Sequence, residues 1–106
     1  MGDISVIELK KRLDAGEKLI LIDVREPFEY EAYHLESDHI PLGDLMAKLD
    51  DLTDYKNKEI ILICRSGNRS GSAAVYMQGF GFAKARNMAG GMRAWQEQID
   101  PTISVL

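Results

Sequence analysis

The sequence predicts an α/β fold in which an open, mostly parallel sheet is flanked by helices on both faces. Two apolar runs, residues 19–24 and 59–64, lack the alternation of polar and apolar residues that a half-exposed strand would have. Such unbroken runs are typical of parallel strands covered on both sides. Segments with helical spacing and capping residues alternate with these runs, and the connections are short.

The first half of the chain carries clear boundary signals for helices. Ser5 and Glu8 match a capping box, and Gly16 is suited to end the helix that they begin. Pro27 and Asp44 stand where the next two helices are expected to begin. The expected elements are a helix over residues 6–15, a strand over 19–24, a short helix over 27–33, an edge segment over 39–41 and a helix over 44–49.

The second half continues the alternation of strands and helices. An acidic run over residues 50–54 is interpreted as a solvated loop that leads to the strand over 59–64. A Gly-Gly turn precedes the last helix, which Trp95 anchors. The other expected elements are a helix over residues 70–79, a strand over 83–87 and a helix over 92–99.

Length, charge and cysteine content restrict the class of protein. A chain of 106 residues is expected to form a single domain with its own core. The net charge of -4 argues against binding to nucleic acid or to an anionic membrane. Cys64 is the only cysteine, so no internal disulfide can form, and we expect a reducing compartment, the cytoplasm. No stretch resembles a signal peptide or a membrane span, and no pattern indicates a cofactor or metal.

Cys64 ends the second apolar run and begins a loop suited to hold an anion. The six residues that follow are polar, flexible or cationic: Arg65, Ser66, Gly67, Asn68, Arg69 and Ser70. A cysteine acts as a nucleophile in its thiolate form, and nearby cations or a helix N-terminus lower the pKa of a thiol. Both conditions are expected, because two arginines lie in the loop and the free N–H groups of the next helix point back into it.

A lone cysteine at the end of an apolar strand is more often an inert, buried side chain. The loop favours a reactive thiol, because its arginines, serines, glycine and asparagine would be a costly lining for an inert one. Asp23 and Arg25 lie at the end of the first strand and are expected at the same edge of the sheet. The interpretation requires Cys64 to be ionised at neutral pH and open to solvent.

Three segments resemble signatures of the rhodanese family, the sulfurtransferases that carry sulfane sulfur as a cysteine persulfide. Residues 64–70, Cys-Arg-Ser-Gly-Asn-Arg-Ser, resemble the family's active loop. Residues 21–27, Leu-Ile-Asp-Val-Arg-Glu-Pro, are similar to its first signature, and residues 89–95, Ala-Gly-Gly-Met-Arg-Ala-Trp, to its C-terminal one. The resemblance covers about residues 4–101, so the chain, residues 1–106, is identified as a single-domain member.

The resemblance implies a rhodanese-like open sandwich of about five mostly parallel strands. It also implies that Cys64 takes the outer sulfur of thiosulfate or another sulfane donor, and that the amides of residues 65–70 hold the persulfide. Arg65 and Arg69 would guide the anionic donor. Arg69 would also tie the loop to a carboxylate such as Asp23, which with Arg25 would have a supporting role. Because the chain has no second cysteine, an external acceptor such as cyanide, a small thiol or a thioredoxin-like protein would remove the sulfur.

One segment departs from the family pattern. Residues 33–38 read Tyr-His-Leu-Glu-Ser-Asp where members usually have Gly-His-Ile-x-Gly-Ala, so both glycines are missing. The departure leaves the local loop conformation open. His34 and His39 are interpreted as surface or structural residues, because no cysteine or helical register accompanies them as in a metal site.

Two other functions stay open alongside thiosulfate sulfurtransfer. A rhodanese-like phosphatase or arsenate reductase would place five residues between cysteine and arginine, whereas four separate Cys64 from Arg69. A sulfur carrier or interaction module that receives persulfide from a dedicated protein donor fits the same motifs.

Overall fold

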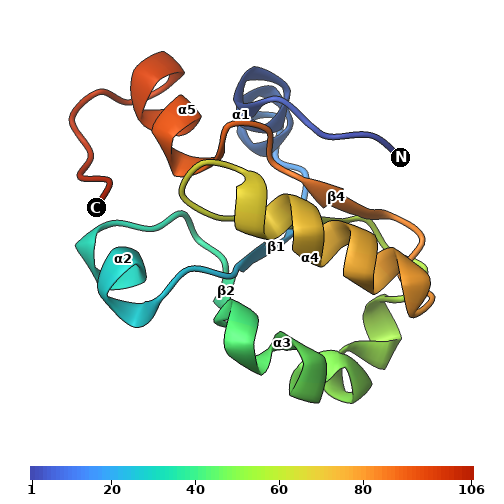
Figure 1. The fold of residues 1–106 in the computed structure, drawn as a ribbon. Coiled ribbons are helices and arrows are strands. Elements are labelled where there is room, and N and C mark those ends of the chain that lie inside the picture. The colour runs from blue at the N-terminus through green and yellow to red at the C-terminus, as the bar shows by residue number, and fades with distance from the viewer.

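A four-stranded parallel sheet forms the centre of the computed structural model, which describes residues 1–106 (Figure 1). The strands lie in the order β2-β1-β3-β4 and are β1 (Ile20–Asp23), β2 (Asp38–His39), β3 (Ile60–Ile63) and β4 (Ala85–Asn87). The helices are α1 (Val6–Asp14), α2 (Pro27–Ala32), α3 (Leu42–Lys48), the 3₁₀ helix η1 (Leu49–Tyr55), α4 (Asn68–Gly79) and α5 (Gly91–Gln98). The predicted α/β class is confirmed.

The sheet has four strands and not the expected five or so. At the outer edge of β4, Ile4 forms a single parallel bridge with Met88, and its N–H donates to the carbonyl of Asn87 (2.9 Å). Ser5 follows at once as the N-cap of α1. The chain therefore turns into a helix after one paired residue, before a fifth strand can form.

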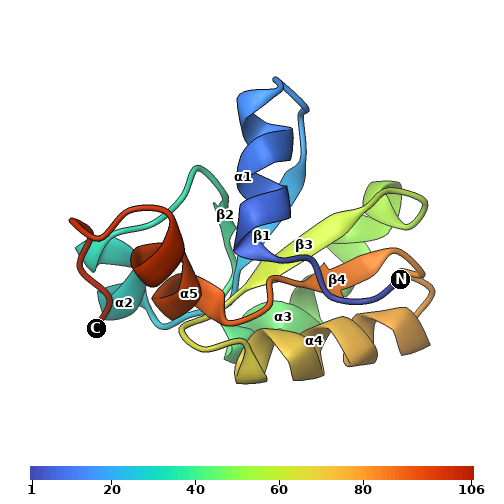
Figure 2. The ribbon, with the colours of Figure 1, turned by 90° about the horizontal axis from the view of Figure 1, so that it is seen from above.

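The sheet is covered on both faces, as the unbroken apolar runs predict. In β3, Ile60 and Leu62 belong with Cys64 to a buried cluster of 13 residues, whereas Ile61 and Ile63 belong to a second cluster of 12. Successive side chains of a strand point to opposite faces, so one short strand contributes to both cores. Residues of α3 and α4 complete the first cluster and residues of α1 and α5 the second, and Figure 2 shows the two pairs on opposite sides of the sheet.

Several element boundaries differ from the expected ones. The helix expected over residues 70–79 begins two residues earlier, at Asn68, because Gly67 adopts a left-handed conformation (φ 95°) and its carbonyl accepts from Gly71 N (3.0 Å). The acidic run over residues 50–54, expected as a loop, lies in η1, where Leu49 and Leu52 are buried. None of the helices has the length and apolar character needed to cross a membrane.

The parallel pairing brings the ends of β1 and β3 to the same edge of the sheet. Asp23 is in register with Ile63, and Val24 N donates to the carbonyl of Ile63 (2.9 Å). Cys64 comes directly after β3, and Arg25 comes two residues after the end of β1. Both therefore lie at the carboxyl edge of the sheet, where ligands bind in open α/β sheets.

Candidate active site

The Cys64 sulfur is surrounded by hydrogen-bond donors from the loop that follows it. Gly67 N lies 3.1 Å from Sγ, Ser70 N 3.3 Å and Ser70 Oγ 3.2 Å. Gly67 can direct its N–H toward the sulfur because its left-handed conformation reverses the chain. Ser70 lies in the first turn of α4, where main-chain N–H groups have no partner within the helix.

The thiol is closed off from solvent, so the expectation of an open thiol is wrong for this structure. Cys64 is 0% exposed. Its side chain continues the inward side of β3 with Ile60 and Leu62, and the loop folds back over the sulfur. Strand alternation directs the Cys64 side chain into the same core as Ile60 and Leu62, and the loop covers the sulfur from the other side.

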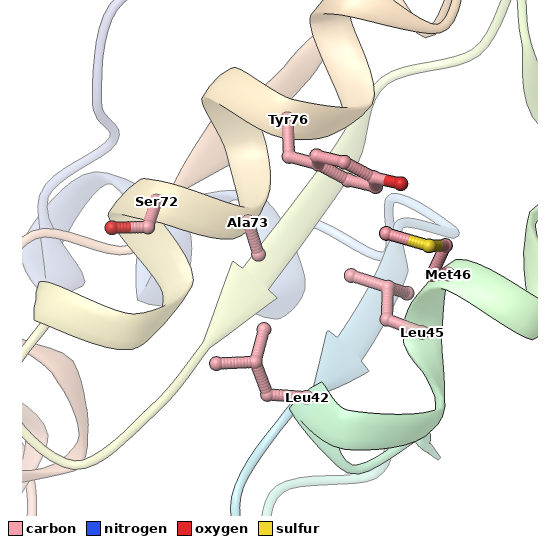
Figure 3. A pocket seen from close by; sticks show the side chains of 6 residues that line it. All are labelled: Leu42, Leu45, Met46, Ser72, Ala73 and Tyr76. Carbon is pink, nitrogen blue, oxygen red and sulfur yellow. The ribbon is translucent and has the colours of Figure 1, made fainter.

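No preformed cavity leads to the sulfur. Of the three cavities in the structure, none is lined by Cys64. An apolar groove of about 290 Å³ lies between α3 and α4, and Figure 3 shows side chains of the two helices facing each other across it. Its lining residues are Leu42, Leu45, Met46, Ser72, Ala73 and Tyr76. A substrate of Cys64 would therefore need the loop to move.

Arg69 ties the loop to a carboxylate, as expected, but that carboxylate is Glu29 of α2 and not Asp23, the residue named in the prediction. Its two terminal nitrogens donate to the two carboxylate oxygens of Glu29, each at 2.8 Å. The hydrogen bonds from Arg69 lower the pKa of Glu29, and the bonds to Glu29 raise the pKa of Arg69. This bidentate pair ties the first turn of α4 to α2.

Asp23 is occupied by Arg25, two residues along the chain. Arg25 Nε lies 2.9 Å from Asp23 Oδ1, and a second nitrogen lies 2.8 Å from Oδ2. Both side chains are buried, and the remaining guanidinium donors bind the carbonyls of Glu29 (3.3 Å) and Tyr33 (2.8 Å). A buried ion pair needs such complete hydrogen bonding. The pair thus holds α2 in place, and α2 presents Glu29 to Arg69.

The other predicted loop residues point away from the sulfur or lie at the surface. Arg65 Nε donates to the main-chain oxygen of Leu106 (2.7 Å), and Ser66 and Asn68 are exposed. The carbonyls of Cys64 and Arg65 accept from the N–H groups of α5. Of the predicted loop residues, Gly67 and Ser70 thus contact the sulfur, whereas Arg65 binds the C-terminal segment.

Asn87 is a part of the site that the sequence interpretation missed. It ends β4, is buried, and its Oδ1 lies 2.5 Å from Ser70 Oγ. A signal was present, because a polar residue ends a short strand just before the Gly-Gly turn. The sequence alone does not give the strand register, which places Asn87 beside Leu62, two residues before Cys64. Without that register, the closeness of Asn87 to the sulfur could not be predicted.

The atypical segment over residues 33–38 is held by aromatic stacking. Tyr30 lies between His34 and His39, with ring centroids 3.7 and 4.1 Å apart and nearly parallel planes. His39 Nε2 lies 2.8 Å from the carbonyl of Arg25, and Tyr30 donates to the carbonyl of Ser37 (3.0 Å). Both histidines therefore have packing contacts, and no group of three or more His, Cys, Asp or Glu side chains is placed to hold a metal ion.

Comparison with known proteins gives one consistent family. A family model described as "Rhodanese-like domain" matches residues 5–98. The Bacillus subtilis protein named "Putative sulfurtransferase YtwF" is 42% identical over 100 residues, covering 93% of this chain and 94% of its own. A second B. subtilis protein, "Putative sulfur carrier protein YrkF", is 43% identical over 94 residues, which cover 88% of this chain and 50% of that protein.

A solved structure supports the fold at lower sequence identity. The human single-domain sulfurtransferase TSTD1 is similar with a TM-score of 0.75 and 26% identity, and the match covers 91% of this chain and 96% of that one. The three segments singled out above lie within the part of the chain that the family model matches.

Proposed function

The chain belongs to the rhodanese-like domain family, and from that membership we propose that it is a sulfurtransferase that carries sulfane sulfur as a persulfide on Cys64. The observation that supports this proposal most directly is the convergence of Gly67 N, Ser70 N and Ser70 Oγ on the Cys64 sulfur. The two main-chain N–H groups, and the hydroxyl once its hydrogen turns to the sulfur, stabilise negative charge on sulfur, whether it is a thiolate or a persulfide.

The proposed reaction has two steps. The Cys64 thiolate attacks the outer sulfur of thiosulfate, a new S–S bond forms, the bond to the sulfonate sulfur breaks, and sulfite leaves with that electron pair. In the second step an external thiolate or cyanide attacks the outer sulfur of the persulfide and restores the Cys64 thiolate. The acceptor is external because the chain holds no second cysteine.

The buried thiol adds a requirement to this scheme. The donor reaches Cys64 when residues 65–68 move outward, since these residues fold over the sulfur and two of them are exposed. Arg69 stays anchored on α2 by Glu29 during this movement. Arg65, whose partner is a surface main-chain oxygen, is free to turn toward an incoming anion, and we assign to it the guiding role.

A sulfur carrier is the second candidate, and the similarity to YrkF favours it. The present chain spans half the length of that protein. As a carrier, the chain would accept sulfur on Cys64 from a protein persulfide and turn thiosulfate over slowly. The same cysteine serves both functions, and they differ in the donor.

Sulfur loading of the intact protein tests the proposal. Reduced protein is incubated with thiosulfate, weighed by mass spectrometry, and assayed with cyanide for sulfite and thiocyanate. We expect one added sulfur on the wild type and none on Cys64→Ser, with thiocyanate formed only by the wild type. Loading without turnover would favour the carrier, and hydrolysis of p-nitrophenyl phosphate without loading would favour a phosphatase.

A further inference from the structure

We propose that Asn87 is a positioning residue that holds the Ser70 hydroxyl hydrogen away from the Cys64 sulfur. Ser70 then offers a lone pair to the thiol, and Asn87 favours the protonated resting form of Cys64. This inference deepens the proposed function and rests on Cys64 being the sulfur-carrying group. It goes beyond the loop itself, because Asn87 lies on β4 and does not contact the sulfur.

The neighbours of the Asn87 amide fix its orientation. Its Nδ2 lies 3.2 Å from Asp3 Oδ2, and an ionised carboxylate can only accept a hydrogen bond. The nitrogen therefore faces Asp3, and the oxygen faces Ser70. A flipped amide would place two acceptors against each other at Asp3.

The Ser70 hydroxyl has a single hydrogen, so it can donate to only one of its neighbours at a time. Ser70 Oγ has two neighbours, Asn87 Oδ1 at 2.5 Å and Cys64 Sγ at 3.2 Å. The amide oxygen has no hydrogen to give, so the hydrogen in the shorter contact belongs to Ser70. A thiol does carry a hydrogen, and it can donate to the free lone pair of Ser70. All three side chains are buried, so water does not substitute for these bonds.

The consequence appears when the thiol loses its proton to solvent. A Ser70 lone pair aimed at a thiolate is unfavourable in a buried site, so the hydroxyl has to turn and donate to the sulfur. Turning breaks the bond to Asn87. The resting thiol is thus stabilised by a bond that the thiolate must replace, and removal of the Asn87 oxygen should make the thiolate easier to form.

Packing keeps the Asn87 side chain in this position. A Cβ built on Gly67 would lie 3.6 Å from Asn87 Nδ2, and one built on Gly71 would lie 3.5 Å from it. The loop and the first turn of α4 therefore lie directly against the amide. Leucine has nearly the same shape as asparagine, so Asn87→Leu removes the acceptor while it keeps the contact.

Other charged groups around the loop stay in place in this variant. They are Arg69 with Glu29, Arg25 with Asp23, Arg65, and Arg93 on α5. Asp3, beyond the amide, loses the hydrogen bond from Asn87 Nδ2. None of them donates to or accepts from Ser70 Oγ. An effect of Asn87→Leu on thiol titration that disappears in a Ser70→Ala background would therefore report on the hydroxyl, whereas an effect through Asp3 would persist in that background.

The experiment is an ultraviolet titration of thiolate absorbance in the full-length chain, with Cys64→Ser as the blank. Cys64 is the only cysteine, so the signal belongs to one sulfur, and it does not depend on access of a reagent. We expect Asn87→Leu to lower the pH midpoint of thiolate formation by about one unit, as one gained hydrogen bond to a charged group would do. Gln78→Leu, which removes another amide bonded to β4 (Gln78 Nε2 to Ala85 O, 2.9 Å), should leave the midpoint unchanged.

A double-mutant cycle makes the inference falsifiable even if Asn87→Leu loosens the fold. In a Ser70→Ala background, Asn87→Leu should have no further effect on the midpoint, since the hydroxyl through which it acts is gone. An unchanged midpoint in Asn87→Leu, or the same shift with and without Ser70, would overturn the proposal. Sulfur loading is measured separately, so a protein that shows the shift but never loads sulfur would reject the proposed function and leave this inference standing.

Discussion

Glu29 is the residue on which the position of Arg69 depends. Glu29→Gln keeps the shape of the side chain but removes its charge, so the bidentate pair loses its charge-assisted bonds. We expect the variant to lose about 1 to 2 kcal/mol of unfolding free energy, a value reduced because Arg69 is partly exposed. We also expect sulfur loading to slow several-fold, because the first turn of α4 is no longer fixed. Urea unfolding and the loading rate measure the two effects.

The pH dependence of this difference has a definite sign. The pKa of Glu29 is lowered from its ordinary 4.5, so its stabilising contribution is present above that value and is lost as the pH falls through the lower folded-state pKa. The stability gap between wild type and Glu29→Gln should therefore be constant from about pH 5.5 to 8 and close in acid. Glu31→Gln, an exposed change on the same helix, is the control, and an equal loss in it would contradict the assignment.

At the residue scale, the sequence was informative where neighbours in the chain are also neighbours in space. Cys64 and its loop donors are contiguous, so their grouping could be predicted. The partner of Arg69 could not be predicted, because Asp23 ends β1, Glu29 follows soon after it, and only the structure reveals that Arg25 already pairs with Asp23. The burial of Cys64 depends on how the loop folds back over the sulfur, which the loop composition does not contain.

The start of α5 presses directly against the active loop. Gly91 has a φ of 60°, and a Cβ there would lie 2.5 Å from the carbonyl oxygens of both Cys64 and Arg65. Gly91→Ala should therefore push the loop outward and cost about 2 kcal/mol or more of unfolding free energy. Thermal unfolding checks the stability, and the pH midpoint of thiolate formation checks the loop.

A matched glycine variant separates this effect from a general response to alanine. Gly43 lies inside α3, and a Cβ there would have no heavy atom within 4 Å. Gly43→Ala should raise the unfolding free energy by up to about 1 kcal/mol, because alanine favours the helix. If both variants changed stability in the same direction, close contact at Gly91 would not be the cause.

At the element scale, composition predicted the type of element better than its ends. Long apolar runs and caps identified β1, β3 and α1, since each signal is local. The early start of α4 depends on the conformation of Gly67, and the replacement of a fifth strand by one bridge at Ile4 depends on how soon Ser5 caps α1. The ends of these elements depend on which of two adjacent elements takes up the residues between them, and the sequence of one segment alone does not determine this.

For the whole molecule, parallel topology assembles the site from distant parts of the chain. The carboxyl ends of β1, β3 and β4 meet at one edge, which brings Arg25, Cys64 and Asn87 into one neighbourhood. Glu59 lies at the opposite end of β3, directly before its first residue. Its carboxylate forms ion pairs with Arg12 of α1 (2.6 Å) and with Arg86 of β4 (2.6 Å). The ion pairs of Glu59 and the Cys64 sulfur thus lie at opposite ends of the central strand.

This separation leads to a prediction about the intact fold. The hydrogen bonds from Arg12 lower the pKa of Glu59 from 4.5 to about 2, against the opposing effect of burial. A lowered folded-state pKa means that the stabilisation is complete above about pH 4.5 and is lost as the pH falls toward 2. Glu59→Gln should therefore lose about 2 to 3 kcal/mol at neutral pH and little near pH 2. Urea unfolding across this pH range measures the loss.

Sulfur loading of the folded variant at pH 7 should equal that of the wild type, because the network lies away from Cys64. A parallel fall in loading and stability while the protein is still folded would show that the two ends of β3 are coupled, contrary to this account.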